Sequence, residues 1–239
     1  MQRISNIDES RRQFLLTLLA TGAMATMPGC TTGTTGGGMP TELPPGRSIH
    51  QLRGDVRVNG LAATLATPIN PGDSVTTGEQ SFVIFVVDKD AFILRSNSSM
   101  TLPPRQVAAG VIPTAYVLNK GKALSVLASR RTNISTPTAV IGVRGTGVYV
   151  EADPDESYVC VCYGATDLQA AGDPGVTETV ITEHHDAPKY VTGGANPRIL
   201  PAPFKNHDDQ ELLLIETLVG RTTPYIVPAG VPRTRSNYF

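Results

Sequence analysis

The sequence predicts an all-β fold of short strands, arranged as a solenoid or sandwich, with one short amphipathic helix near the C-terminus. Glycine and proline are abundant, at 23 and 19 of 239 residues, and divide the chain into short segments. The apolar residues are mainly Val, Ile, Leu and Ala, and tryptophan is absent, which favours strands over long helices. Turn residues recur at intervals of about 8–12 residues, which is typical of all-β domains built from short strands.

Residues 1–30 have the pattern of an export signal. Arg11 and Arg12 precede an apolar stretch that small residues interrupt and that ends at Cys30. This stretch is shorter than the ~20 apolar residues of a membrane-spanning helix. The segment SRRQFL resembles a twin-arginine (Tat) signal, and the alternative is an ordinary secretory signal that carries two arginines. A small residue directly before Cys30, at the end of the apolar stretch, resembles the lipobox of bacterial lipoproteins. We therefore expect Cys30 to be acylated, and its acyl chains to anchor an exported, periplasm-facing protein to a membrane.

The rest of the chain divides by composition. Residues 31–47 are rich in Gly, Thr and Pro and predict a flexible tether. We then expect a β domain over 48–153, a β extension over 154–203 and a helix with a proline-rich tail over 204–239. The net charge is −1 and no basic block occurs, so nucleic acid is not an expected partner.

Turn residues mark the expected strands in order. Residues 51–60 alternate in polarity and turn at Asn59-Gly60, and the runs FVIFVV and AFILR flank the polar turn DKD as in a hairpin. Residues 115–128 predict two strands about Asn119-Lys120-Gly121. Residues 158–170 predict a strand, a turn at Gly164 and another strand.

The pattern becomes helical over residues 208–219. Apolar residues recur at i, i+3 and i+7, Asp208 and Glu211 have the spacing of a capping box, and Gly220 follows. We expect one amphipathic helix of three turns that packs against the sheet.

Residues 54–151 resemble the FecR domain family. The segments LRGDVRVNG, INPGDSVTTGEQSFVIFVVDKDAFILRSNSSMTL, NKGKALSVL and ISTPTAVIGVRGTGVYVE follow that family's pattern in order, and the last is the most specific. The resemblance implies a solenoid-like, periplasm-facing β domain. Within it, Arg144, Gly145 and Thr146 are interpreted as a structural motif, because glycines inside a strand run mark a bulge or a close backbone approach.

The order of segments differs from that of FecR proteins of iron signalling. The resemblance implies a cytoplasmic helical region and a transmembrane helix ahead of the β domain in those regulators. Here a signal and a tether precede it, so direct control of a cytoplasmic sigma factor is not expected.

Cys160 and Cys162 are the candidate metal ligands. In a strand they share one face, and their Cα atoms are ~6.6 Å apart with parallel Cβ vectors, which disfavours a disulfide between them. With His184, His185 and His207 they form a possible zinc or copper site, because thiolates and imidazoles suit these ions. The alternative is that both cysteines are buried small hydrophobes.

Two further expectations concern the geometry of this site. If residues 183–185 are extended, His184 and His185 point to opposite sides, so at most one binds easily. A ligating imidazole also needs an acceptor for its other nitrogen, for which we expect Asp186 or Asp208.

Two functions remain open from the sequence. The leading interpretation is an exported, lipid-anchored FecR-like module that binds a protein or ligand in envelope assembly or signalling. The alternative is a metal-binding or metal-sensing periplasmic protein. No nucleophile elbow, Walker loop or Rossmann glycine pattern occurs, so an enzyme is not expected.

Overall fold

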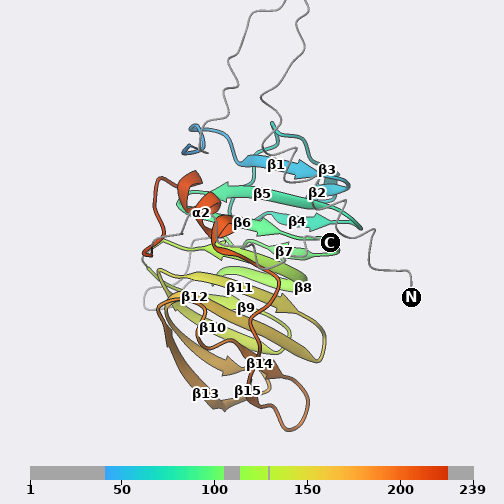
Figure 1. Cartoon of the computed structure of the whole chain (residues 1–239). Helices are drawn as coiled ribbons and strands as arrows, with labels where there is room; N and C mark the ends of the chain where they lie inside the picture. The colour runs from blue at the N-terminus through green and yellow to red at the C-terminus, as the bar shows by residue number, and fades with distance from the viewer. Residues whose placement is uncertain (1–40, 105–113, 129, 226–239) are drawn as a thin grey trace, which may run out of the picture. The chain divides into compact units, whose positions relative to one another are not determined.

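The described strands form one hydrogen-bonded network, which divides into two sheets, A and B, that share two long strands (Figure 1). This computed structural model describes residues 41–104, 114–128 and 130–225. The expected signal, with Arg11, Arg12 and Cys30, lies outside the described residues. Fifteen strands occur in the described part of the chain, together with one short helix, so the predicted all-β class is confirmed.

Sheet A lies next to the helix. Its strands are hydrogen-bonded antiparallel throughout. Their order is β1 (Ile49–Arg53), β5 (Phe82–Val87), β6 (Asp90–Leu94), β8 (Thr114–Val126), β11 (Gly147–Ala152), β12 (Glu156–Ala170), β14 (Lys189–Thr192) and β15 (Ile199–Pro201).

Sheet B forms the second layer. Neighbouring strands within sheet B run antiparallel, except for β8 and β9, which run parallel. Their order is β3 (Leu61–Ala62), β2 (Val56–Val58), β4 (Ser74–Thr77), β7 (Ser99–Thr101), β8, β9 (Arg131–Ser135), β10 (Ala139–Arg144), β12 and β13 (Asp173–Thr182).

Two long strands, β8 and β12, belong to both sheets. β8 pairs with sheet B up to Lys120 and with sheet A from Gly121, and β12 changes sheet at Gly164. Both glycines have φ values, +90° and +95°, that other residues rarely adopt. A Cβ at Gly121 would lie 2.2 Å from Oγ of Ser98. The prediction of two separate strands in each segment is therefore wrong, because these glycines bend one strand without reversing it.

Short turns form the predicted hairpins. Asn59 and Gly60 both have positive φ, 52° and 80°, and join β2 to β3 as the Asn-Gly pair predicts. Val87 pairs with Asp90, so two residues join β5 to β6. These two hairpins are confirmed.

The main core lies between the two sheets. Phe85 and Phe92 stack at 4.9 Å between ring centroids, and Tyr116 meets Phe92 edge to face at 5.5 Å. In β10, Ala139, Ile141 and Val143 are buried while the residues between them are partly exposed, as expected for a strand with one buried face. Nearly all residues of β5, β6 and β11 are buried, on both faces of these strands, and the helix covers the outer side of sheet A at β6 and β8.

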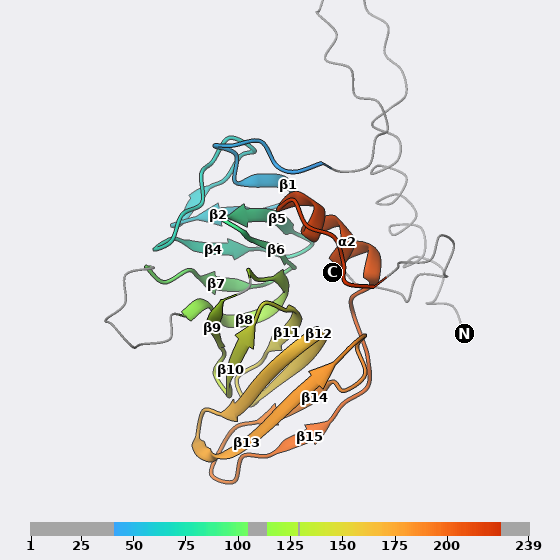
Figure 2. The ribbon, with the colours of Figure 1, turned by 90° about the vertical axis from the view of Figure 1, so that its left-hand side faces the viewer.

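The helix α2 (Asp209–Leu218) packs on the outer face of sheet A, beside β6 and β8 (Figure 2). Asp208 and Glu211 form the expected capping box, in which each side chain accepts from the other's backbone N–H. Leu212, Ile215 and Leu218 are buried against the sheet. The expected amphipathic helix is thus confirmed.

A buried ion pair fixes the first turn of α2. Nη2 of Arg95, which follows β6, lies 2.8 Å from Oε1 of Glu211, and both side chains are almost fully buried. The guanidinium also lies 5.4 Å from the centroid of the Tyr149 ring. The helix start is therefore held at a defined place on sheet A.

The segments before and after residues 54–151 join the same structure. Leu43, in the expected tether, donates its N–H to the carbonyl of Leu218 at 3.0 Å. β12 to β15 extend the two sheets that the earlier strands begin. Within the described residues, no helix is both long and apolar enough to cross a membrane.

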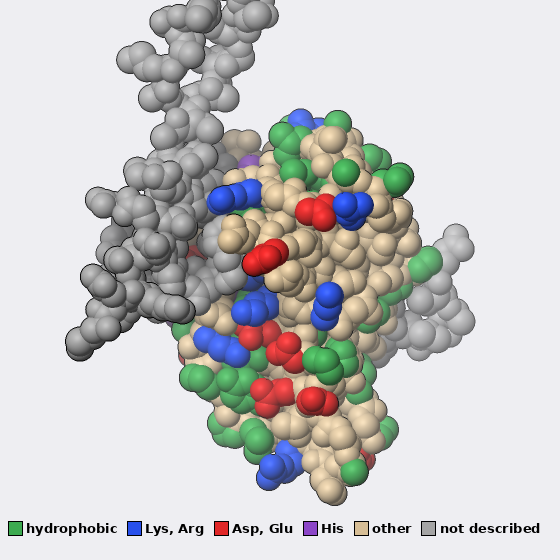
Figure 3. Space-filling view, turned by 90° about the vertical axis from the view of Figure 1, so that its right-hand side faces the viewer, with side chains coloured by type: hydrophobic (Ala, Val, Ile, Leu, Met, Phe, Trp, Pro, Cys, Tyr) green, Lys and Arg blue, Asp and Glu red, His purple; other side chains and the backbone are tan. Residues whose placement is uncertain are grey.

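The surface carries charges of both signs. On the face in Figure 3, Lys and Arg side chains lie beside Asp and Glu side chains. Arg57 and Asp55 form one exposed pair of this kind, with 3.0 Å between Nε and Oδ1.

Candidate metal centre

Cys160 and Cys162 point from β12 into the layer that contains α2. The alternate residues Val159 and Val161 belong to the core between the sheets, so the two cysteines face the other side of sheet A. Both are fully buried free thiols. The shared face expected from the sequence is present, and it lies beneath the helix layer.

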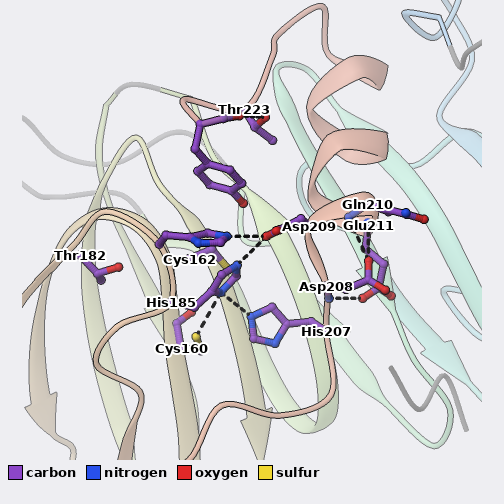
Figure 4. Close-up of polar contacts among 12 residues, drawn as sticks. Cys160, Cys162, Thr182, His185, His207, Asp208, Asp209, Gln210, Glu211 and Thr223 are labelled. Carbon is purple, nitrogen blue, oxygen red and sulfur yellow. Dashed lines mark hydrogen bonds and ion pairs between the residues drawn. The ribbon is translucent and has the colours of Figure 1, made fainter. Parts of the chain in front are cut away.

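The loop between β13 and β14 brings His185 to Cys160. The N–H of His185 donates to the carbonyl of Cys162 at 3.1 Å. Nδ1 of His185 then lies 3.6 Å from Sγ of Cys160 (Figure 4). The strand register explains why His185 approaches Cys160. Thr182 at the end of β13 pairs with Gly164, and the residues after Thr182 continue alongside the half of β12 that carries Cys160 and Cys162.

His207 completes the group from the segment just before α2. Its Nε2 lies 3.0 Å from Nδ1 of His185, and its Nδ1 lies 2.8 Å from the carbonyl of Lys205. A carbonyl can only accept, so Nδ1 carries a proton, and Nε2 is the nitrogen that faces His185. Metal-ligating histidines commonly donate their other ring N–H to a carbonyl in this way.

The donor atoms of Cys160, His185 and His207 all lie within 4.8 Å of one another. Around a tetrahedral zinc, bonds of about 2.3 Å to sulfur and about 2.0–2.1 Å to nitrogen place a sulfur about 3.6 Å from a nitrogen and two nitrogens about 3.3 Å apart. The observed separations of 3.6 Å and 3.0 Å are close to these values. These two separations agree with a tetrahedral ion to within a few tenths of an ångström, and the third, between the donor atoms of Cys160 and His207, is at most 4.8 Å.

Cys162 lies outside this group of three donor atoms. Its Sγ lies 3.8 Å from the carbonyl oxygen of Cys160, towards which it donates. This contact is with the backbone of Cys160, and the Cys162 sulfur is not one of the three donor atoms that lie together.

Asp209 is the acceptor that the sequence analysis missed. Its Oδ1 lies 2.9 Å from Nε2 of His184 and 3.1 Å from Nε2 of His185. The two expected acceptors have other partners: Asp208 caps α2, and Asp186 accepts from the N–H of Glu183. Asp209 is the first residue of α2, two positions after His207, and that proximity was the available signal.

His184 and His185 both reach Asp209, contrary to the expectation for an extended segment. Residues 183–185 form a bend, and His185 has a positive φ of 57°. This conformation turns the two side chains to one side and costs free energy for a residue with a Cβ. The condition for the two side chains to point apart, an extended segment, is therefore not met.

The cluster favours a thiolate beside an imidazolium. The Cys162 thiol, followed by His185 and His207, lowers the pKa of Cys160 to about 3 although burial raises it. Burial and the charge of Cys160 raise the pKa of Cys162. Burial alone would lower the pKa of His185, but Cys160 and Asp209 outweigh it and raise that pKa.

Aromatic rings enclose the histidines. Tyr149 stacks on His207 with 4.5 Å between centroids, and Phe204 lies 4.8 Å from His185 and 4.7 Å from His207. Tyr225 lies 4.4 Å from the ring of His184. These contacts restrict the rotation of the imidazoles and limit the access of water.

Glu151 holds the segment that carries His207. Its buried carboxylate accepts from Tyr149 at 2.7 Å and from Asn206 at 2.6 Å, and Lys205 Nζ lies 2.9 Å away. Residues 205 and 206 immediately precede His207, so β11 positions this ligand through them. The hydrogen bonds from Asn206, Lys205 and Tyr149 lower the pKa of Glu151 against the effect of burial.

The Arg144-Gly145-Thr146 segment carries the chain from β10 in sheet B to β11 in sheet A. Gly145 has φ +66°, Thr146 is fully buried, and Arg144 is exposed with Nη2 3.5 Å from Oδ2 of Asp167. Arg144 also lines a hollow of about 400 Å³ on sheet B, among residues of β9, β10, β12 and β13. No residue of the Cys–His cluster lines this hollow.

The fold and the site together define an all-β protein with a buried cysteine–histidine cluster under its single described helix. No protein-family model matches the chain, and no curated protein does. Two solved structures of a putative anti-sigma factor from Parabacteroides distasonis are similar in fold, with TM-scores of 0.44 and 0.43 and identities of 16% and 15%. Each match covers 58% of this chain and 62% of that protein, which is less than two thirds of its length.

Proposed function

We propose that this protein binds a zinc or copper ion through Cys160, His185 and His207. The observation that carries the proposal is the convergence of three donor atoms within 4.8 Å, from three segments of the chain. Thiolate and imidazole are the ligands that both ions prefer. The lowered pKa of Cys160 supports this function, because the thiolate is the form that binds metal.

The proposed setting is the bacterial cell envelope. The twin arginines and Cys30 support an exported, periplasm-facing lipoprotein with a FecR-like domain that binds a protein in envelope assembly or signalling. Export through the Tat route suits a buried thiolate site, because the chain folds and takes up metal while its cysteines are reduced. The metal joins β12, the loop before β14 and the start of α2, so its presence determines how firmly the helix layer is held.

A thiolate, an imidazole and a carboxylate in a row also resemble a nucleophile with its base. Cys160, His185 and Asp209 have this order. A substrate must reach the sulfur, but Cys160 is 0% exposed and the hollow on sheet B lies elsewhere. The burial therefore favours a metal ligand, and we propose that the protein is not an enzyme.

Metal content tests this function. The full chain is expressed with its own signal, purified from the envelope and analysed for zinc and copper, beside the Cys160→Ser and Cys162→Ser variants. We expect bound metal in the wild type, its loss in Cys160→Ser and its retention in Cys162→Ser, a matched control from the same strand face. A metal-free wild type that also takes up no added Zn²⁺ would refute the proposal.

A further inference from the structure

The ring of His185 has two nitrogens, and each faces a different set of donor atoms. Nδ1 faces the sulfur of Cys160 and Nε2 of His207, whereas Nε2 faces Oδ1 of Asp209 (Figure 4). The proposed metal centre uses only Nδ1. The other side of the ring therefore has a set of donors that this centre does not use.

The donors on the Nε2 side form a second compact group. Nε2 of His184, Nε2 of His185 and Oδ1 of Asp209 all lie within 4.8 Å of one another, and the carboxylate oxygen is 2.9 Å and 3.1 Å from the two nitrogens. Bonds of about 2.0–2.2 Å to nitrogen and oxygen place such donors a little more than 3 Å apart around one tetrahedral ion. The group thus has the size of a divalent cation site.

We propose that His185 bridges two metal ions, one held with Cys160 and His207 and the other held with His184 and Asp209. This inference rests on the proposed function of the first site. The ring binds as an imidazolate, Nδ1 to one ion and Nε2 to the other, and both ring protons pass to solvent.

The two sites differ in chemistry and in exposure. The first is buried and contains a thiolate, which suits zinc or copper. The second has two nitrogens and a carboxylate oxygen, and its side chains are more open, with His184 49% and Asp209 24% exposed. A zinc ion there keeps at least one position for water or for a donor from another molecule, as open zinc sites do.

The local backbone favours the bridging position. His185 adopts φ +57°, and this conformation allows consecutive histidines to reach the same carboxylate. Backbone strain of this kind concentrates at functional sites. The positive end of the α2 dipole opposes a cation at Asp209, but the carboxylates of Asp208 and Asp209 at the helix start offset it.

Zinc stoichiometry tests the bridge. The metal-free full chain is dialysed against increasing Zn²⁺, and bound zinc per chain is measured for the wild type and for His184→Ala, His185→Ala and Asp186→Asn. We expect two ions in the wild type, one in His184→Ala and two in Asp186→Asn, a control carboxylate from the same loop. In His185→Ala both ions are expected to bind at least tenfold more weakly, because they share that ring.

The outcomes separate this inference from the proposed function. One zinc in the wild type, lost in Cys160→Ser, would overturn the bridge and leave the first site intact. Two zinc ions that both remain in His184→Ala, or a loss of only one in His185→Ala, would also overturn it. If circular dichroism shows that His185→Ala does not fold, the number of zinc ions bound per chain in His184→Ala decides the test alone. No zinc in the wild type would overturn both proposals.

Discussion

The sulfur of Cys160 lies 3.6 Å from Nδ1 of His185, although 25 residues separate them in the sequence. The β12–β13 hairpin accounts for this contact, because it returns Thr182 opposite Gly164 and leads the following residues over the cysteines. A second approach, from the segment before α2, adds His207 at 3.0 Å from the same ring nitrogen. The site therefore depends on how β12, its hairpin partner and α2 are held together.

The buried pair of Arg95 and Glu211 is expected to hold α2 to sheet A. Glu211→Gln keeps an acceptor for the capping box but leaves the buried guanidinium without its charged partner. Breaking one side of a buried pair costs about 3–5 kcal/mol, and urea unfolding monitored by circular dichroism measures the loss. Asp55→Asn, in the exposed pair with Arg57, is the control and should cost less than about 1 kcal/mol. Equal losses in the two variants would contradict the anchoring role.

The apolar face of α2 is expected to contribute through Ile215. Ile215 is fully buried, whereas Leu214 is only half-buried. Ile215→Ala should lower the free energy of unfolding by about 2–5 kcal/mol, since it removes buried methyl groups and leaves a cavity. Leu214→Ala should cost clearly less. If Ile215→Ala unfolds like the wild type in urea, the helix is a loosely attached appendage.

Acid is expected to weaken the anchor of the His207 segment through Glu151. Its pKa in the folded protein is below the usual 4.5, so its contribution to stability is present above that value and is lost as the pH falls through the folded pKa. Glu151→Gln should therefore be less stable than the wild type at pH 7, and this difference should shrink below about pH 4.5. Unfolding measured from pH 7 to pH 3 checks it, with the exposed Glu156→Gln as control. A difference that does not change with pH would contradict the assigned hydrogen bonds.

Patterns in the sequence predict the fold better than they predict the site. Alternation, Asn59-Gly60 and the Asp208/Glu211 capping box act locally, so the strands, hairpins and helix follow from neighbouring residues. The bends at Gly121 and Gly164 depend on which sheet each half of a strand joins, and that choice comes from distant partners. Cys160 and His207 were recognisable as donors by residue type. The role of Asp209 and the shared direction of His184 and His185 depend on packing against α2 and on the backbone of one loop.

Anchoring is expected to depend on Cys30. Cys30→Ala should release the exported protein from the membrane fraction, because its acyl chains provide the attachment. Arg11→Lys combined with Arg12→Lys should stop export and leave precursor inside the cell. Fractionation followed by immunoblotting measures both effects, with Cys162→Ser as a cysteine control. Unchanged fractionation of Cys30→Ala would refute lipidation at this residue.

X-ray absorption at the zinc edge tests the central claim most directly, since it counts the atoms bound to the ion. The full chain is loaded with one equivalent of Zn²⁺, and the Cys160→Ser and Cys162→Ser variants are treated in the same way. We predict one sulfur at about 2.3 Å with at least two imidazole nitrogens at about 2.0–2.1 Å. The sulfur should disappear in Cys160→Ser and remain in Cys162→Ser. A wild-type shell of nitrogen and oxygen alone would contradict a metal centre built on Cys160, His185 and His207.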